Sequence, residues 1–236
     1  MRNFIIVFLV FFISCNHKND NPLELEILNE SILSSKNKGK LQDIYEGMKD
    51  SNIVSKSKTI ITYKLTNHSN SVYYFNLNPN SNLRNKIEGI SLKNGILCIY
   101  QNDNNKEVRI RTHRINLNFN ENDCYSKNFK ISNFLEYSKD FNSPYIQEQV
   151  NFIIHPNETL FFEWFVNLPY GNEIQNANLE LDGNKEYYAE MLIFSDSINY
   201  KKSVSRTTLK NIKQNNYRVF HGIIKSKNRV PIKFVE

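Results

Sequence analysis

The chain has 236 residues, of which 13% are aromatic, a mean hydropathy of −0.54 and a formal net charge of +6. This length and composition predict one soluble domain whose core relies on Phe, Tyr and Ile. Because the chain has only 7 Gly, Gly-rich loops that cradle phosphate groups are not expected. The positive charge is concentrated near the C-terminus, where the segment from Tyr200 onward holds ten Lys and Arg but only one acid, Glu236.

The N-terminal segment carries the most specific signal in the sequence. Arg2 precedes an unbroken apolar run, residues 4–13, which stops at Ser14 and Cys15. A helix that spans a bilayer needs roughly 20 apolar residues. The shorter run is instead typical of a secretory signal peptide.

Phe12-Ile13-Ser14-Cys15 resembles the lipobox of bacterial lipoproteins, with Phe at a position where Leu is more usual. In that family a diacylglyceryl group is attached to the cysteine thiol, and a peptidase cuts just before the cysteine. The resemblance implies that residues 1–14 are a signal peptide, that Cys15 is lipidated and that residues 15–22 form a tether to a membrane. The protein would be exported and anchored to a membrane, and we expect the outer membrane. Both of its faces, the periplasmic face and the cell surface, stay open as locations for the protein. The alternative is an ordinary secretory peptide with a coincidental cysteine.

Period-2 alternation predicts a mainly β domain over residues 23–236. The first strand is expected at residues 23–27, where Leu and Ile alternate with Glu. Strands joined by turn-forming residues are expected at 61–65 and 72–77, within 96–115, and at 217–224 and 230–235. Two further strands are expected around 160–166 and 187–194, the second after the turn at Asp182-Gly183. One short helix is predicted over 203–214, with Ser203 or Ser205 as its N-cap, and residues 116–150 are expected to form a long irregular insertion.

Two stretches of this pattern, ITYKLTNHSNSVYYF and HPNETLFFEWFV, resemble immunoglobulin-like sandwich modules of bacterial envelope proteins. The resemblance implies an immunoglobulin-like β-sandwich with one or two short helices. A related sandwich fold occurs in certain bacterial proteinase inhibitors, which suggests a protein-binding function as one alternative.

Two cysteines remain beyond Cys15. Cys98 and Cys124 form an even pair in a chain that is expected to be exported, and such pairs commonly become disulfides. The sequence does not show whether their Cα atoms lie within bonding distance, so the disulfide and two free thiols both stay open.

Basic residues suggest an anionic partner. Arg109, Arg111 and His113 alternate with apolar residues on the expected strand 107–113, so one face of that strand would be basic. Lys225, Lys227 and Arg229 gather at the tip of the last expected hairpin. Both groups predict binding to lipid headgroups, an acidic glycan or an acidic protein surface. The alternative is an ordinary solvated face on a basic chain.

The C-terminal helix adds to this charge. Lys202, Arg206, Lys210 and Lys213 recur at near-helical spacing in and just before the expected helix. The same two interpretations apply to them, an anionic partner or a solvated polar face.

No catalytic, metal-binding or cofactor site is predicted. The five His are scattered, and the motifs of zinc hydrolases, serine hydrolases and dinucleotide-binding proteins are absent from the sequence. The leading hypothesis is a non-enzymatic, lipid-anchored envelope protein that binds or scaffolds a partner there, without nucleic acid because the chain is exported. A protein-binding sandwich of the proteinase-inhibitor type and an enzyme of unrecognised type are the alternatives.

Overall fold

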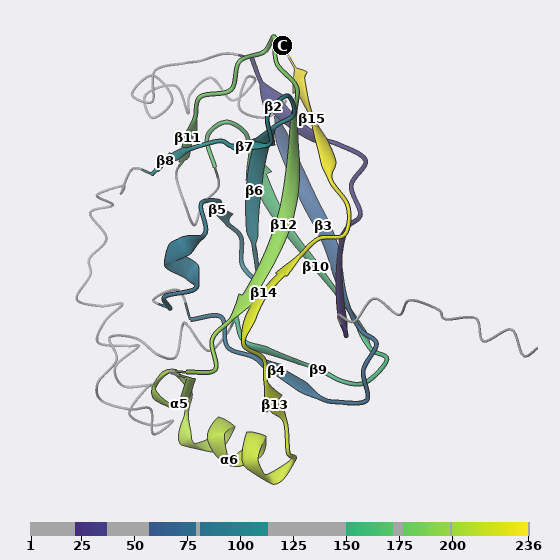
Figure 1. The fold of residues 1–236 in the computed structure, drawn as a ribbon, viewed down its shortest axis with the longest axis vertical. Helices are drawn as coiled ribbons and strands as arrows, with labels where there is room; N and C mark the ends of the chain where they lie inside the picture. Colours follow the sequence, from purple (N-terminus) through teal and green to yellow (C-terminus); the bar gives the residue numbers. More distant parts are fainter. Residues whose placement is uncertain are drawn as a thin grey trace, which may run out of the picture.

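Ten strands form two facing β-sheets in the computed structural model, which describes residues 22–36, 57–78, 81–112, 150–171, 177–198 and 200–235 (Figure 1). The first sheet consists of β1 (Leu23–Ile27), β3 (Lys58–Asn67) and β10 (Thr159–Asn167), in the order β1-β3-β10. The second contains β2 (Ile32–Ser35), β15 (Val230–Val235), β12 (Tyr187–Ser195), β6 (Ile96–Gln101) and β5 (Ile90–Ser91), in that order. Two further strands, β14 (Gly222–Lys225) and β7 (Lys106–Glu107), pair with β12 and β6. The predicted mainly β class, with a sandwich of sheets, is confirmed.

Alternating side chains explain how the first sheet is oriented. Along β1 the Leu and Ile side chains are buried, whereas Glu24 and Glu26 lie on the outer face. The neighbouring β3 shows the same alternation over Ile61, Tyr63 and Leu65. In β10 the inward residues include Phe162. One face of this sheet therefore packs on the core and the other meets water.

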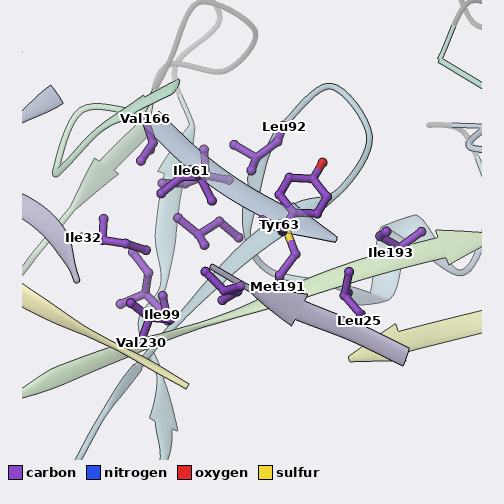
Figure 2. Packing of buried hydrophobic residues seen from close by; sticks show 14 of the residues in the cluster. Leu25, Ile32, Ile61, Tyr63, Leu92, Ile99, Val166, Met191, Ile193 and Val230 are labelled. Atoms are coloured by element: carbon purple, nitrogen blue, oxygen red, sulfur yellow. The ribbon is translucent and has the colours of Figure 1, made fainter. Parts of the chain in front are cut away.

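The main core lies between the two sheets (Figure 2). Ile61 and Tyr63 of β3 belong to one buried cluster with Met191 and Ile193 of β12 and Val230 of β15. All five side chains are almost fully buried. Burying an aliphatic or aromatic side chain of this size contributes about 1.5–3 kcal/mol, so the packing of the two sheets against each other is the main source of stability.

Smaller elements surround this sandwich. One small sheet has the order β13-β4-β9, and a two-stranded sheet pairs β8 with β11. Their bounds are β4 (Tyr73–Phe75), β8 (Ile110–Thr112), β9 (Phe152–Ile154), β11 (Ala177–Leu179) and β13 (Arg218–Val219). The helices in the described residues are the 3-10 helix η2 (Arg84–Lys86) and the α-helices α5 (Tyr200–Ser203) and α6 (Arg206–Gln214). Ser205 is the N-cap of α6 and accepts a hydrogen bond from the Thr208 N–H, which confirms one of the two predicted caps.

Two of the predicted strand pairings are wrong, and two predicted strands are divided. The strand after the NHSNS turn does not pair with β3; it becomes β4 and pairs with β9 and β13 in another sheet. The expected strand 107–113 is split between β7, which pairs with β6, and β8, which pairs with β11. The expected strand 217–224 becomes β13 and β14, which belong to different sheets. The second wrong pairing is that of β14 with β15. These two strands do not pair with each other, because both pair with β12. The NHSNS turn connects strands of two different sheets, whereas the segment between β14 and β15 connects two strands of the same sheet.

The segment between β14 and β15 is a wide bulge rather than a hairpin tip. Leu192 of β12 lies opposite Lys225, whereas Ala189 lies opposite Val230. Two residues of β12 therefore face four residues of the segment between β14 and β15. We call these four residues, 226–229, the KSKN bulge, from the letters KSKN at positions 225–228. The bulge reaches the free edge of β1, where the Lys227 N–H donates to the Leu25 carbonyl over 2.8 Å. It thus connects the two sheets along one side.

Candidate functional site

Cys15, the residue predicted to be lipidated, lies outside the residues that the structure describes, as do Cys124 and His113. The described chain begins at Pro22, whose carbonyl accepts a hydrogen bond from the His68 N–H over 2.7 Å. The predicted tether therefore joins the fold beside the turn between β3 and β4.

The predicted basic residues divide into two groups. Arg109 is exposed between β7 and β8, and Lys225 is exposed on β14. Arg111 belongs to β8, but its side chain is not described. Lys227 and Arg229 lie in the KSKN bulge and contact carboxylates.

Lys227 neutralises acids of β1. Its Nζ lies 2.9 Å from Glu24 Oε1 and 3.0 Å from Glu26 Oε2. Hydrogen bonds to these two carboxylates raise the pKa of Lys227 above its ordinary value. Lys64 contacts Glu26 from the other side at 3.0 Å, so this is a mixed-charge cluster and not a free cationic surface.

Arg229 is held in a similar way. Its Nε donates to Glu190 Oε1 over 2.8 Å, and its guanidinium lies over the Tyr188 ring, 4.3 Å from the centroid. Tyr188 donates its hydroxyl hydrogen to Asn105 Oδ1 over 2.9 Å. Two of the six predicted patch residues thus have partners within the chain, and anion binding by the patch stays a prediction. The partners themselves could not be predicted, since Glu24 and Lys227 are about 200 positions apart.

The largest concentration of exposed positive charge lies elsewhere, on α5, α6 and β13. The segment 200–221 contains no Asp or Glu. All of its Lys and Arg are exposed, and we call these side chains the α5–α6 surface: Lys201, Lys202, Arg206, Lys210, Lys213 and Arg218. Within the described part of the chain, no ion pair involves Lys201, Lys202, Lys210 or Lys213. The helical spacing in the sequence had pointed to four of these six residues.

The α5–α6 surface has a rigid base. Ile212 of α6 and Val204 are buried against Tyr74 of β4, which leaves the charged side of α6 outward. Ser203 at the end of α5 donates to Asn76 Oδ1 over 3.0 Å, and Asn76 Nδ2 donates to the Asp196 carbonyl over 2.9 Å. Because these groups are buried and hydrogen-bonded, the helices are fixed to the end of β12.

Open cavities among the described residues include the following two. One of about 490 Å³ lies beside β12 and β15 and is lined by Asn102, Glu186, Tyr188, Arg229 and Phe234, among others. Another of about 350 Å³ lies between α6 and β9 and includes Asn151, Asn211 and Tyr217. The sequence did not indicate either, because their walls come from segments far apart in the chain.

Cys98 belongs to a second buried cluster, with Ile87, Ile96, Leu192 and Phe194. Its side chain is 0% exposed, and its Sγ donates to the Glu88 carbonyl over 3.0 Å. Burial raises the pKa of the thiol to about 12, so Cys98 is not a thiolate at neutral pH. Burial, followed by the nearby Glu88 carboxylate, also raises the pKa of Glu107. Because Cys124 is not described, the disulfide with Cys98 stays a prediction.

Comparisons with known proteins assign no family. No protein-family model, curated protein sequence or solved structure matches the chain. Within the described ranges, no helix is both long and apolar enough to cross a bilayer. Nor do three or more His, Cys, Asp or Glu side chains come together in these ranges to hold a metal ion.

Proposed function

We propose that this protein is a lipid-anchored bacterial envelope protein whose β-sandwich binds or scaffolds a partner at the membrane. The observation that carries the proposal is the run of features at the N-terminus. A short apolar segment ends in Ser14-Cys15, and the first strand starts only eight residues later, at Leu23. Such an arrangement supports a fold held close to a lipidated cysteine.

The binding part of the proposal is supported by the 490 Å³ cavity beside β12 and β15. There the Tyr188 ring, the Arg229 guanidinium and the Asn102 amide line one open space. Ligand sites commonly combine aromatic walls with a few convergent polar groups. This cavity is therefore the candidate contact site for a partner.

Replacing Cys15 by Ala tests the anchor. We expect the wild-type protein to sediment with membranes and to incorporate a labelled fatty acid, and the Cys15→Ala variant to lose the label and leave the membrane fraction. Asn16→Ala is the matched control, since it changes the adjacent residue and keeps the thiol. A wild-type protein that is secreted without label would support the ordinary secretory peptide and overturn the anchor.

A protein-binding function is the second candidate, and the edge of the first sheet favours it. β10 is the end strand of its sheet, and no described strand pairs with its outer edge. Phe161 on β10 and Ile60 on β3 are 67% and 59% exposed on the outer face. Such an edge can accept a strand from another protein.

A charge placed on this face distinguishes the two candidates. Phe161→Asp should abolish capture of a protein partner by this face and leave membrane anchoring intact, whereas Glu163→Gln on the same face should affect neither. Crosslinking in cells gives the readout for the partner, and a panel of proteases tests the inhibitor version. Unchanged crosslinks in Phe161→Asp, together with no inhibition of any protease, would remove the support for this candidate.

A further inference from the structure

We propose that the α5–α6 surface rests on the anionic phospholipid headgroups of the membrane that holds the lipid anchor, and so fixes the orientation of the fold there. This inference rests on the proposed function, because the anchor supplies the nearby membrane. Beyond that function, the inference names the surface that contacts the membrane, the chemical class of its partner and the orientation of the fold.

Charge is the first argument. The six cations of the α5–α6 surface occur in a segment, 200–221, that has no acid of its own. The closest acid before this segment is Asp196, which is buried and lies 3.6 Å from His221. Each Lys or Arg close to an anionic bilayer contributes attraction that adds to that of the others. The surface is therefore complementary to a sheet of negative headgroups.

Position is the second argument, because a series of contacts links Pro22, where the described chain begins, to the base of the α5–α6 surface. Pro22 contacts His68, and the side chain of the adjacent Asn67 donates to the His155 carbonyl over 3.0 Å. The His155 ring packs edge-on against Tyr217, 6.3 Å between centroids. Tyr217 in turn donates its N–H to the Ile212 carbonyl at the end of α6. Figure 1 shows α5, α6, β13, β4 and β9 together at the lower end, opposite β2 and β7.

The length of the tether brings this end close to the bilayer. Seven residue steps separate Cys15 from Pro22, and an extended chain covers at most about 3.6 Å per residue, or roughly 25 Å in total. The anchored fold is thus confined to a thin layer above the headgroups. The lipid anchor is the first contact with the membrane, and the contact of the α5–α6 surface with the headgroups is the second. Because the second contact forms within an already anchored molecule, it is populated even if it is weak.

An exposed apolar side chain is the third argument, and it favours a bilayer over an acidic protein. Ile198 lies two residues before α5 and is 74% exposed, more than the other large apolar side chains in the described ranges. Its N–H donates to Asp196 Oδ1 over 2.8 Å, and in the sequence it lies three and four positions before Lys201 and Lys202. An apolar side chain next to cations is typical of elements that enter the headgroup layer.

Vesicle binding tests the inference without the anchor. The protein used is residues 15–236 with Cys15→Ser. This is the whole chain that remains after the proposed cleavage, and the substitution removes the thiol that would carry the lipid. We expect it to bind vesicles of mixed phosphatidylglycerol and phosphatidylcholine, to bind phosphatidylcholine vesicles far more weakly, and to dissociate as NaCl is raised. The Lys202→Gln, Lys210→Gln, Lys213→Gln triple variant should bind about 100-fold more weakly, at about fivefold per lysine.

Two variants serve as matched comparisons. Lys106→Gln, Lys185→Gln, Lys233→Gln removes the same charge from exposed lysines on β7, before β12 and on β15, and it should bind like the parent. Ile198→Ser should weaken binding a few-fold at high as well as low salt, because its contribution is apolar. Circular dichroism establishes that all variants are folded.

The outcomes separate this inference from the proposed function. Absence of binding to phosphatidylglycerol vesicles, or equal losses in both triple variants, would overturn the headgroup contact even if Cys15 carries lipid. Conversely, unlabelled Cys15 together with specific vesicle binding would overturn the anchor and leave the contact standing. Capture of an acidic protein by the α5–α6 surface, without vesicle binding, would also overturn the inference.

Discussion

At the scale of single residues, Gly95 shows how closely the second sheet is packed. It precedes β6 in a tight turn in which the Leu92 N–H donates to the Gly95 carbonyl over 2.8 Å. A Cβ at this position would lie 2.9 Å from the Leu192 carbonyl oxygen and 3.1 Å from Met191 Sδ. Because a backbone oxygen cannot move without shifting β12, only glycine fits here without strain.

We expect Gly95→Ala to lower the free energy of unfolding by about 1–3 kcal/mol, the usual cost of overpacking. Urea denaturation followed by fluorescence measures the change. Gly183→Ala is the control, since its Cβ would meet only Lys36 Cγ at 3.7 Å. Equal urea midpoints for Gly95→Ala and the parent would contradict this packing argument.

At the scale of elements, the KSKN bulge replaces a missing strand beside β1. The Asn228 side chain accepts from the Ile27 N–H over 2.9 Å and donates to the Ile27 carbonyl over 2.7 Å. These are the two hydrogen bonds that a neighbouring strand would make. A single side chain therefore satisfies the edge of β1 at this point.

Asn228→Ala should lower the free energy of unfolding by about 1–3 kcal/mol, because it leaves both backbone groups of Ile27 without their partner. Lys227→Gln, one residue earlier, removes only exposed ion pairs and should cost less than about 1 kcal/mol. Chemical denaturation of the two variants side by side makes the comparison. A larger loss in Lys227→Gln would show that charge, and not the amide, joins the bulge to β1.

At the scale of the whole molecule, the two sheets are also joined by charge. Hydrogen bonds from Lys64 and then Lys227 lower the pKa of Glu26 below its ordinary value of 4.5. Lys64 belongs to the same sheet as Glu26, whereas Lys227 comes from the bulge that interrupts the second sheet. A carboxyl group with a lowered pKa in the folded state contributes stability above its unfolded pKa, and this contribution is lost as the pH falls through the folded value.

We therefore expect Glu26→Gln to be less stable than the parent at neutral pH, by less than about 1 kcal/mol because the pair is solvent-accessible. The difference should vanish as the pH falls below the ordinary carboxyl pKa. Urea denaturation across this pH range is the measurement, with Glu163→Gln on the outer face of the same sheet as control. A difference that persists in acid would mean that Glu26 acts through packing.

The sequence was informative about local structure and much less so about pairing. Alternation along β1, β3 and β10 and the Ser205 cap of α6 were predicted correctly because each depends on residues a few positions apart. The partners of β4, β14 and β15 were not, because pairing is decided by burial against distant strands. The same limit applies to the site: helical spacing indicated the α5–α6 surface, whereas the contact of Arg229 with Glu190 and the cavity beside it depend on the assembled sheet.

The position of β15 has a consequence for the order in which the molecule can be made. β15 lies between β2, to which it is parallel, and β12, to which it is antiparallel, and Ile32 is opposite Ile232. The second sheet therefore stays split until the last of its strands to be synthesised has left the ribosome. Such long-range closure is slow. A protein that crosses a membrane before folding would benefit from this delay.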